Sequence, residues 1–250
     1  MLVIGKNPVL EILKSTPREL NKIVLLKKQN PEKTLELIVK TAKENSVNLI
    51  FLNYFEFKKF FDSKNKQEGI DQGVIGFIKD YRYVSVRDIA ESNTKIQNPL
   101  ILILDRITDP HNLGAIIRSA VCLGADGIVI PRHESAEINH TVIKASSGSV
   151  NYIQIAKETN LSNTVLFLKD KGYFITGTEM NCTKTIFETD FRIPLALIIG
   201  NEGEGIRSNL KKHCDFLVRI PMTGKLNSLN ASVSTAIFLY EIFRQKNLKC

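Results

Sequence analysis

Clusters of cysteine and histidine are missing from this sequence. The 250 residues contain four of each, and the cysteines, at positions 122, 182, 214 and 250, form no C-x-x-C pair. This scatter argues against a disulfide framework, and the histidines add no spacing that suits a metal ion. We therefore expect reduced thiols and no bound metal.

Long apolar runs are missing as well. No stretch approaches the ~20 residues that a membrane-spanning helix needs. The opening sequence MLVIGKNPVLEIL lacks a signal-peptide core followed by a small-residue cleavage site. These absences predict a cytoplasmic protein with no membrane partner.

Two common nucleotide-binding motifs are also absent. No G-x-G-x-x-G follows any expected strand, which argues against a nucleotide-dependent oxidoreductase. The tripeptide TGK is not part of a phosphate-binding loop, because Arg219 stands where the first glycine belongs and Leu226 follows the lysine.

A modest excess of positive charge is present. The 34 basic and 26 acidic side chains give a formal charge of +8. A basic balance favours nucleic acid as a partner. Residues 1–80 hold 14 basic and 10 acidic side chains and residues 81–250 hold 20 and 16, so each part carries +4 and the signal is weak.

The first 80 residues alternate short β-rich runs with helical patterns. Strands are expected over 22–26, 47–52 and 73–78, and helices begin at Asn7-Pro8, Asn30-Pro31 and Tyr54. This alternation predicts a small α/β domain over residues 1–80. Lys58 and Lys59, beside Phe57 and Phe60, either touch RNA or form a solvated face over a packed one. The polar stretch 81–98 is interpreted as a linker.

Residues 99–250 have a different character. Continuous apolar runs are expected to form strands over 100–104, 127–130, 152–156, 173–178, 195–199 and 216–220, with helical patterns between most of them. Runs of this kind predict a mostly parallel sheet covered by helices. Ligands bind such sheets beyond the carboxyl ends of the strands, so the loops there are the functional candidates.

The first unusual loop is DPHNLGAIIR, over 109–118. Asn112 is placed to cap a helix, and Asn112 and Gly114 sit where a backbone can approach a ligand. Arg118 follows on the expected helix beside an apolar stripe. It is either an ordinary surface arginine or one with a directed role.

The second loop is GNEGEG, over 200–205, directly after the apolar run LALII. Its three glycines permit a tight turn, but its glutamates would repel a phosphate. We expect a loop that wraps a ligand with backbone groups while Glu202 fixes a polar contact. The alternative is an ordinary strand-to-helix turn.

The third stretch is IPMTGKLNSLNAS, over 220–232. Ser228, Asn230 and Ser232 crowd the start of a helix expected to begin at Asn230. Such side chains cap a helix or face a ligand. Three of them are more than a cap needs, so we predict a site here, with capping alone as the alternative.

Together, NLGAIIR, IIGNEGEGI and IPMTGKLNSLNAS resemble the three motifs of the SpoU, or TrmH-like, RNA ribose 2'-O-methyltransferases, in order and with the family's spacing. VIGKNPVLEIL and QGVIGF resemble the L30e-like domain that precedes the catalytic domain in the bacterial 23S rRNA guanosine 2'-O-methyltransferases. That family often has histidine before QG, where this chain has Asp71.

The resemblance implies an α/β fold with a deep trefoil knot at the carboxyl end of a mostly parallel sheet. It also implies a smaller L30e-like α/β domain for RNA binding over residues 1–80, and a catalytic domain over 99–250. Members of the family are homodimers with the active site near the subunit interface.

The resemblance also implies roles for particular residues. S-adenosylmethionine is expected to be held largely by backbone groups around Thr178, Gly200, Ile220 and Leu229. Five further positions are assigned to catalysis: Arg118, Ser228 and Asn230 at the catalytic motif positions, Glu202 on the cofactor-side loop, and Asn112 at the RNA-side position of the first motif.

The implied chemistry fits these residue types. A methyl sulfonium is already an activated electrophile, so the protein must place the ribose oxygen in line and stabilise the developing alkoxide. Guanidinium holds its proton too strongly to serve as a base. We therefore hypothesise that Arg118 acts electrostatically, while the proton passes to a phosphate oxygen or to water.

The resulting prediction is S-adenosylmethionine-dependent methylation of a ribose 2'-hydroxyl in structured RNA, with a guanosine of 23S rRNA as the first choice. The same reaction on tRNA is a close alternative. A non-catalytic RNA-binding assembly factor is a further alternative from a different functional class.

Overall fold

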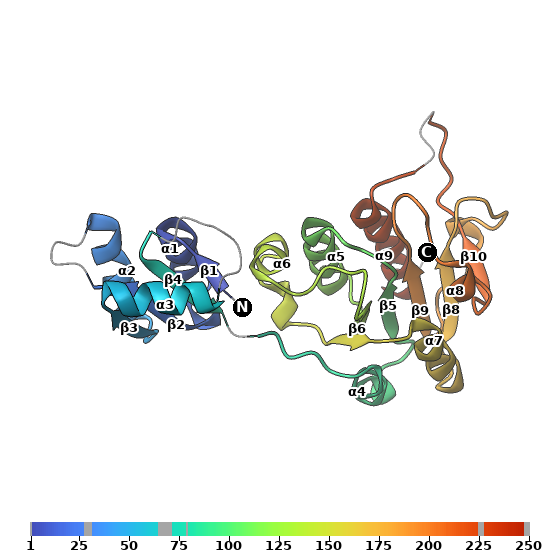
Figure 1. Cartoon of the computed structure of the whole chain (residues 1–250). Coiled ribbons are helices and arrows are strands. Elements are labelled where there is room, and N and C mark those ends of the chain that lie inside the picture. Colours follow the sequence, from blue (N-terminus) through green and yellow to red (C-terminus); the bar gives the residue numbers. More distant parts are fainter. Residues whose placement is uncertain (1, 28–31, 65–71, 79, 225–227, 248–250) are drawn as a thin grey trace. The chain divides into compact units, whose positions relative to one another are not determined.

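The chain divides into two compact units, Met1–Tyr81 and Arg82–Cys250. The computed structural model describes residues 2–27, 32–64, 72–78, 80–224 and 228–247 (Figure 1). Asp71 and residues 225–227, which belong to the motifs above, lie outside the described residues.

Strands and helices alternate along the first unit. In chain order they are β1 (Leu2–Ile4), α1 (Lys6–Ser15), β2 (Leu20–Leu26), α2 (Lys33–Glu44), β3 (Asn48–Leu52), α3 (Tyr54–Lys64) and β4 (Val74–Ile78). The strand order in the sheet is β1-β4-β2-β3, with β2 parallel to β3 and β4 antiparallel to its two neighbours. The short strand β1 was not expected from the sequence.

Each face of this sheet is covered by helices. Ile12 of α1 and Ile38 of α2 are buried in one apolar cluster, and Phe57 and Phe61 of α3 are buried in another. The spacing of these side chains matches the helical period, so burial of one face of each helix accounts for the packing.

The second unit contains a sheet in which every strand pair is parallel. Its order is β10-β8-β9-β5-β6-β7. The strands are β5 (Leu100–Leu104), β6 (Gly127–Pro131), β7 (Ile155–Glu158), β8 (Phe174–Thr178), β9 (Leu195–Ile199) and β10 (Phe216–Val218). Every residue of β5, β6 and β9 is buried, as the continuous apolar runs predicted.

Helices cover both faces of the parallel sheet (Figure 1). They are α4 (Val86–Ser92), α5 (Pro110–Cys122), α6 (His140–Ala145), α7 (Leu161–Asp170), α8 (Ser208–Lys211) and α9 (Ala231–Asn247). Side chains of α4, α7 and α8 share one core with the sheet. Helix α5 lies on the other side, packed against α6 and α9. The predicted α/β class with a mostly parallel sheet is confirmed.

Two sequence-based assignments differ from the structure. Residues 82–98, interpreted as a linker, belong to the second unit, because α4 packs against the sheet: Ile89 is fully buried, and a Cβ built on Gly127 would lie 2.4 Å from its Cγ2. The strand expected over 152–156 begins instead at Ile155, and Tyr152 is 82% exposed.

Candidate active site

A pocket of about 330 Å³ lies at the carboxyl ends of β8, β9 and β10. All four residues predicted to hold a cofactor, Thr178, Gly200, Ile220 and Leu229, line it. Glu202 and Ser228 line it as well. The loops that follow these strands therefore come together as the topology predicted.

One carboxylate oxygen connects the three motif loops. Glu202 Oε1 accepts hydrogen bonds from Asn112 Nδ2 at 2.8 Å, from Asn230 Nδ2 at 2.7 Å and from the backbone N–H of Ala231 at 3.0 Å. Asn230 Nδ2 also donates to Asn112 Oδ1 at 2.9 Å. These charge-assisted bonds fix the start of α5, the β9–α8 loop and the start of α9 relative to one another.

Asn230 caps α9 in addition to this contact. Its Oδ1 accepts from the backbone N–H of Ser232 at 2.9 Å, from Ser232 Oγ at 2.6 Å and from the N–H of Val233 at 3.4 Å. Capping alone, the alternative weighed from the sequence, does not account for all contacts of Asn230. Its carbonyl oxygen caps the helix, and its amide nitrogen also binds Glu202 and Asn112.

The loop after β9 closes on itself. The backbones of Asn201 and Gly205 exchange two hydrogen bonds, of 3.2 and 2.9 Å. A Cβ built on Gly200 would lie 2.3 Å from the carbonyl carbon of Gly205, and Gly205 itself has a φ of +65°. Only glycine fits both positions without strain, so these two glycines serve the turn itself.

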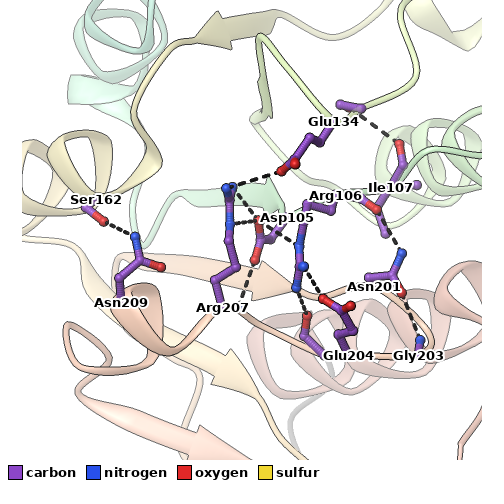
Figure 2. A network of polar contacts seen from close by, with 12 residues as sticks. Asp105, Arg106, Ile107, Glu134, Ser162, Asn201, Gly203, Glu204, Arg207 and Asn209 are labelled. Atoms are coloured by element: carbon purple, nitrogen blue, oxygen red, sulfur yellow. Dashed lines mark hydrogen bonds and ion pairs between the residues drawn. The ribbon is translucent and has the colours of Figure 1, made fainter.

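A buried ion pair holds this loop from the side of β5. Figure 2 shows Asp105, which is fully buried at the end of β5, against Arg207. Arg207 donates from its backbone N–H to Asp105 Oδ2 at 2.9 Å and from Nε to Oδ1 at 2.8 Å. The pair ties the end of the loop to the centre of the sheet.

Arg106 grips the same loop beside this pair (Figure 2). Its guanidinium donates to Glu204 and to the carbonyl of Gly205, and its own carbonyl accepts from Asn201 Nδ2 at 3.1 Å. Glu204 is thereby held by Arg106 while Glu202 binds Asn112 and Asn230. The two glutamates of the loop therefore have different partners, and the partner of Glu204 was not predicted from the sequence.

A further carboxylate at the pocket belongs to Glu179. Burial by itself would raise the pKa of Glu179, but the ion pair with Lys211 and backbone hydrogen bonds outweigh burial and hold the pKa below its usual value. Both side chains line the pocket. Neither was predicted from the sequence, because a single charged residue after a strand (Glu179) or at the end of a short helix (Lys211) carries no distinctive spacing.

Of the five proposed catalytic residues, Glu202 and Ser228 line the pocket, and Asn112 and Asn230 are bonded to Glu202. Arg118 does not line the pocket. It lies on α5 with an exposed side chain, and its guanidinium donates to Ser147 Oγ at 3.2 Å. Ser147 precedes Gly148 in the turn after α6, and both have positive φ. The arginine is therefore oriented by a neighbouring turn.

Gly114 has a packing role. A Cβ built there would lie 2.5 Å from the Cβ of Ala145 and 2.9 Å from the carbonyl oxygen of Val142. The glycine thus permits close contact between α5 and α6, and our interpretation of Gly114 as a point of ligand approach was wrong.

Among the described residues, no group of three potential metal ligands occurs, and no helix is long and apolar enough to cross a membrane.

Two family models match the chain. One, described as the SpoU rRNA Methylase family, covers residues 99–240, and the other, described as RNA 2'-O ribose methyltransferase substrate binding, covers residues 2–84. The chain belongs to the SpoU methylase family. The predicted family is confirmed, and with it the enzyme class, RNA methyltransferase, and the family's cofactor, S-adenosylmethionine.

Similar proteins align along almost the whole chain. A putative TrmH family tRNA/rRNA methyltransferase, YacO of Bacillus subtilis, is 38% identical over 98% of this chain and 96% of its own length. The 23S rRNA (guanosine-2'-O-)-methyltransferase RlmB of Escherichia coli is 32% identical over 98% and 99%. Among solved structures, an AdoMet-bound rRNA methyltransferase from Sinorhizobium meliloti is 25% identical and superimposes with a TM-score of 0.66. The match covers 99% of this chain and 88% of the Sinorhizobium meliloti chain.

Proposed function

We propose that this SpoU methylase transfers a methyl group from S-adenosylmethionine to the 2'-hydroxyl of a guanosine in 23S rRNA. The junction of Asn112, Glu202 and Asn230 beside the pocket carries this proposal. It joins the cofactor-side loop to the two stretches that hold the other motif residues.

The pocket suits the cofactor in size and lining. Its volume of about 330 Å³ lies at the lower end of the range for small-molecule sites. Ile220 and Leu229 offer apolar surface for an adenine ring, and the turns at Thr178 and Gly200 offer backbone groups for the polar parts. When bound, S-adenosylmethionine supplies an electrophilic methyl group on a sulfonium.

Protein groups perform the remaining tasks. The Glu202 junction fixes the start of α9, so that Ser228 is held at the pocket and orients the cofactor or the ribose. Arg118 grips the RNA phosphate and stabilises the negative charge that develops on the ribose oxygen. The proton leaves to a phosphate oxygen or to water, because a guanidinium does not accept one.

We further propose that Arg118 acts on the pocket of a second copy in a homodimer. Two observations support this arrangement. The Arg118 guanidinium is exposed, and it donates a hydrogen bond to Ser147, which does not line the pocket. Helix α9 exposes Val233, Ile237 and Tyr240, an apolar face suited to burial between copies.

The rRNA target is favoured over tRNA by the first unit. The matched substrate-binding model covers residues 2–84, and the RlmB relative aligns across both units, whereas tRNA enzymes of the family mostly lack such a domain. We therefore propose an L30e-like RNA-binding domain over residues 1–80 and a catalytic domain over 99–250 with a deep trefoil knot. The cytoplasm is the proposed compartment.

Two measurements test the proposal. Calorimetry of the whole chain with S-adenosylmethionine is expected to show binding heat, and its absence would favour the non-catalytic assembly factor. Ribose-methylation mapping of 23S rRNA from cells with and without the chain is expected to differ at one guanosine. A difference confined to tRNA would favour the tRNA alternative.

A further inference from the structure

Three aromatic side chains are exposed within five residues of the first unit. Phe51, near the end of β3, is 51% exposed, and Tyr54 and Phe55, at the start of α3, are 61% and 83% exposed. The neighbouring Phe57 is buried at 2%. Single exposed aromatics need no explanation, but these three follow one another where β3 ends and α3 begins.

A helix cap fixes the backbone that carries Tyr54 and Phe55. Asn53 Oδ1 accepts from the backbone N–H of Glu56 at 2.9 Å, and Glu56 Oε2 accepts from that of Asn53 at 3.0 Å. This reciprocal cap fixes the first turn of α3. The rings of Tyr54 and Phe55 meet edge to face, with centroids 5.9 Å apart. Their exposure is therefore a property of a defined turn.

A groove of about 740 Å³ adjoins Phe51. Its floor is apolar, with Leu25 and Val39 among the lining side chains. The charged side chains of its lining are three lysines, Lys27, Lys40 and Lys43, and one carboxylate, Glu36. Lys27 and Lys43 form no ion pair among the described residues, while Lys40 has only a 4.0 Å contact with Glu44.

Further along α3, Lys58 and Lys59 are also exposed. The chain from Phe51 to Phe55 spans at most about 14 Å, so the three aromatic residues lie within the reach of a few nucleotides. Phe51 lines the groove together with its three lysines. Lysine is depleted at protein–protein interfaces. Aromatic rings among unpaired lysines are instead typical of surfaces that bind single-stranded nucleic acid.

We propose that this aromatic–lysine surface, formed by Phe51, Tyr54, Phe55 and the groove lysines, stacks unpaired bases of the RNA substrate. The inference rests on the proposed function, since it names a structural class for its substrate: RNA with an unpaired segment. Bases in a regular duplex do not present their faces to aromatic side chains, whereas splayed bases of loops and bulges do. The lysines contact the backbone phosphates.

The absence of tryptophan from the chain allows a direct test. In the Phe55→Trp variant of the whole chain, the indole emission reports contacts of this position alone. Titration with a short oligouridine strand is expected to quench that emission, and a duplex RNA of the same length is expected to leave it nearly unchanged. The matched control is Leu37→Trp on α2, a residue that is 40% exposed and does not line the groove.

A second variant measures the energetic contribution. Phe55→Ala is expected to weaken oligouridine binding roughly 5- to 150-fold, the range found for loss of one base–aromatic stack, while Leu37→Ala leaves it unchanged. Equal quenching by strand and duplex, or none by either, would overturn the proposal. So would an emission change that follows protein concentration alone, which would mark this surface as a contact between copies. These readouts need no methyl transfer, so a chain that bound no S-adenosylmethionine would still test the surface.

Discussion

Asn112 and Asn230 lie 118 positions apart in the chain, and their side-chain amides donate to the same carboxylate oxygen of Glu202. The three residues come from three separate motif loops. Their hydrogen bonds hold three distant segments together beside the pocket. The contribution of each amide should therefore depend on the presence of the other.

A double-mutant cycle tests this dependence. We expect Asn112→Ala and Asn230→Ala each to weaken binding of S-adenosylmethionine, and the double variant to lose less than the sum by about 1 kcal/mol, because both amides bind the same oxygen. Calorimetry of the four proteins gives the coupling. The control is Asn209→Ala, which removes a hydrogen bond to Ser162 Oγ (3.1 Å) outside this junction. Its effect on binding should add to that of Asn230→Ala. Additivity of the Asn112 and Asn230 losses would contradict a shared junction.

The glycine loop offers a matched pair of substitutions. Gly200→Ala places a Cβ 2.3 Å from the backbone of Gly205, whereas Gly203→Ala brings its Cβ no closer than 3.5 Å to Asn201 Oδ1. We expect the first variant to lose cofactor binding, because the turn must open, and the second to bind almost as the wild type does. Calorimetry distinguishes them, and equal affinities would show that the tight turn is not required.

The buried ion pair predicts a difference between two variants that both change contacts of Arg207. Arg207→Met removes the closer charged partner of the buried Asp105, leaves only Arg106 Nε at 4.0 Å, and should lower the free energy of unfolding by about 3 kcal/mol. Glu134→Gln removes only the exposed 3.7 Å contact with Arg207 and should cost less than ~1 kcal/mol. Urea denaturation followed by circular dichroism measures both. A similar loss in the two variants would mean that burial of Asp105 is not what stabilises the loop.

Much of the second unit was predictable, because parallel strands buried on both faces appear as continuous apolar runs. For β5 and β9, the strand bounds predicted from the sequence are the same as those in the structure. Short or amphipathic pieces were harder. Helix α4 was taken for part of a linker, because its polar face dominates the sequence and its capping box of Ser85 and Asp88 was not recognised.

The site was predictable as three loops, but its connections were not. Hydrogen-bond partners such as Glu202 with Asn112 depend on how the loops fold together, and one sequence contains no signal for that. The pairing of Asp105 with Arg207 joins residues 102 positions apart, and no pattern in the sequence predicted it. Gly114 was misread because close helix packing and close ligand approach both select glycine.

The central claim, a pocket from one copy completed by Arg118 of another, is tested most directly by mixing two inactive variants. One carries Arg118→Ala and keeps its pocket, and the other carries Gly200→Ala and keeps its arginine. After subunit exchange, half of the dimers are mixed and each has one complete site, so we expect about a quarter of the wild-type methylation rate. A rate no higher than that of the separate variants would contradict the account, because it would mean that Arg118 serves the pocket of its own chain or does not act in the reaction.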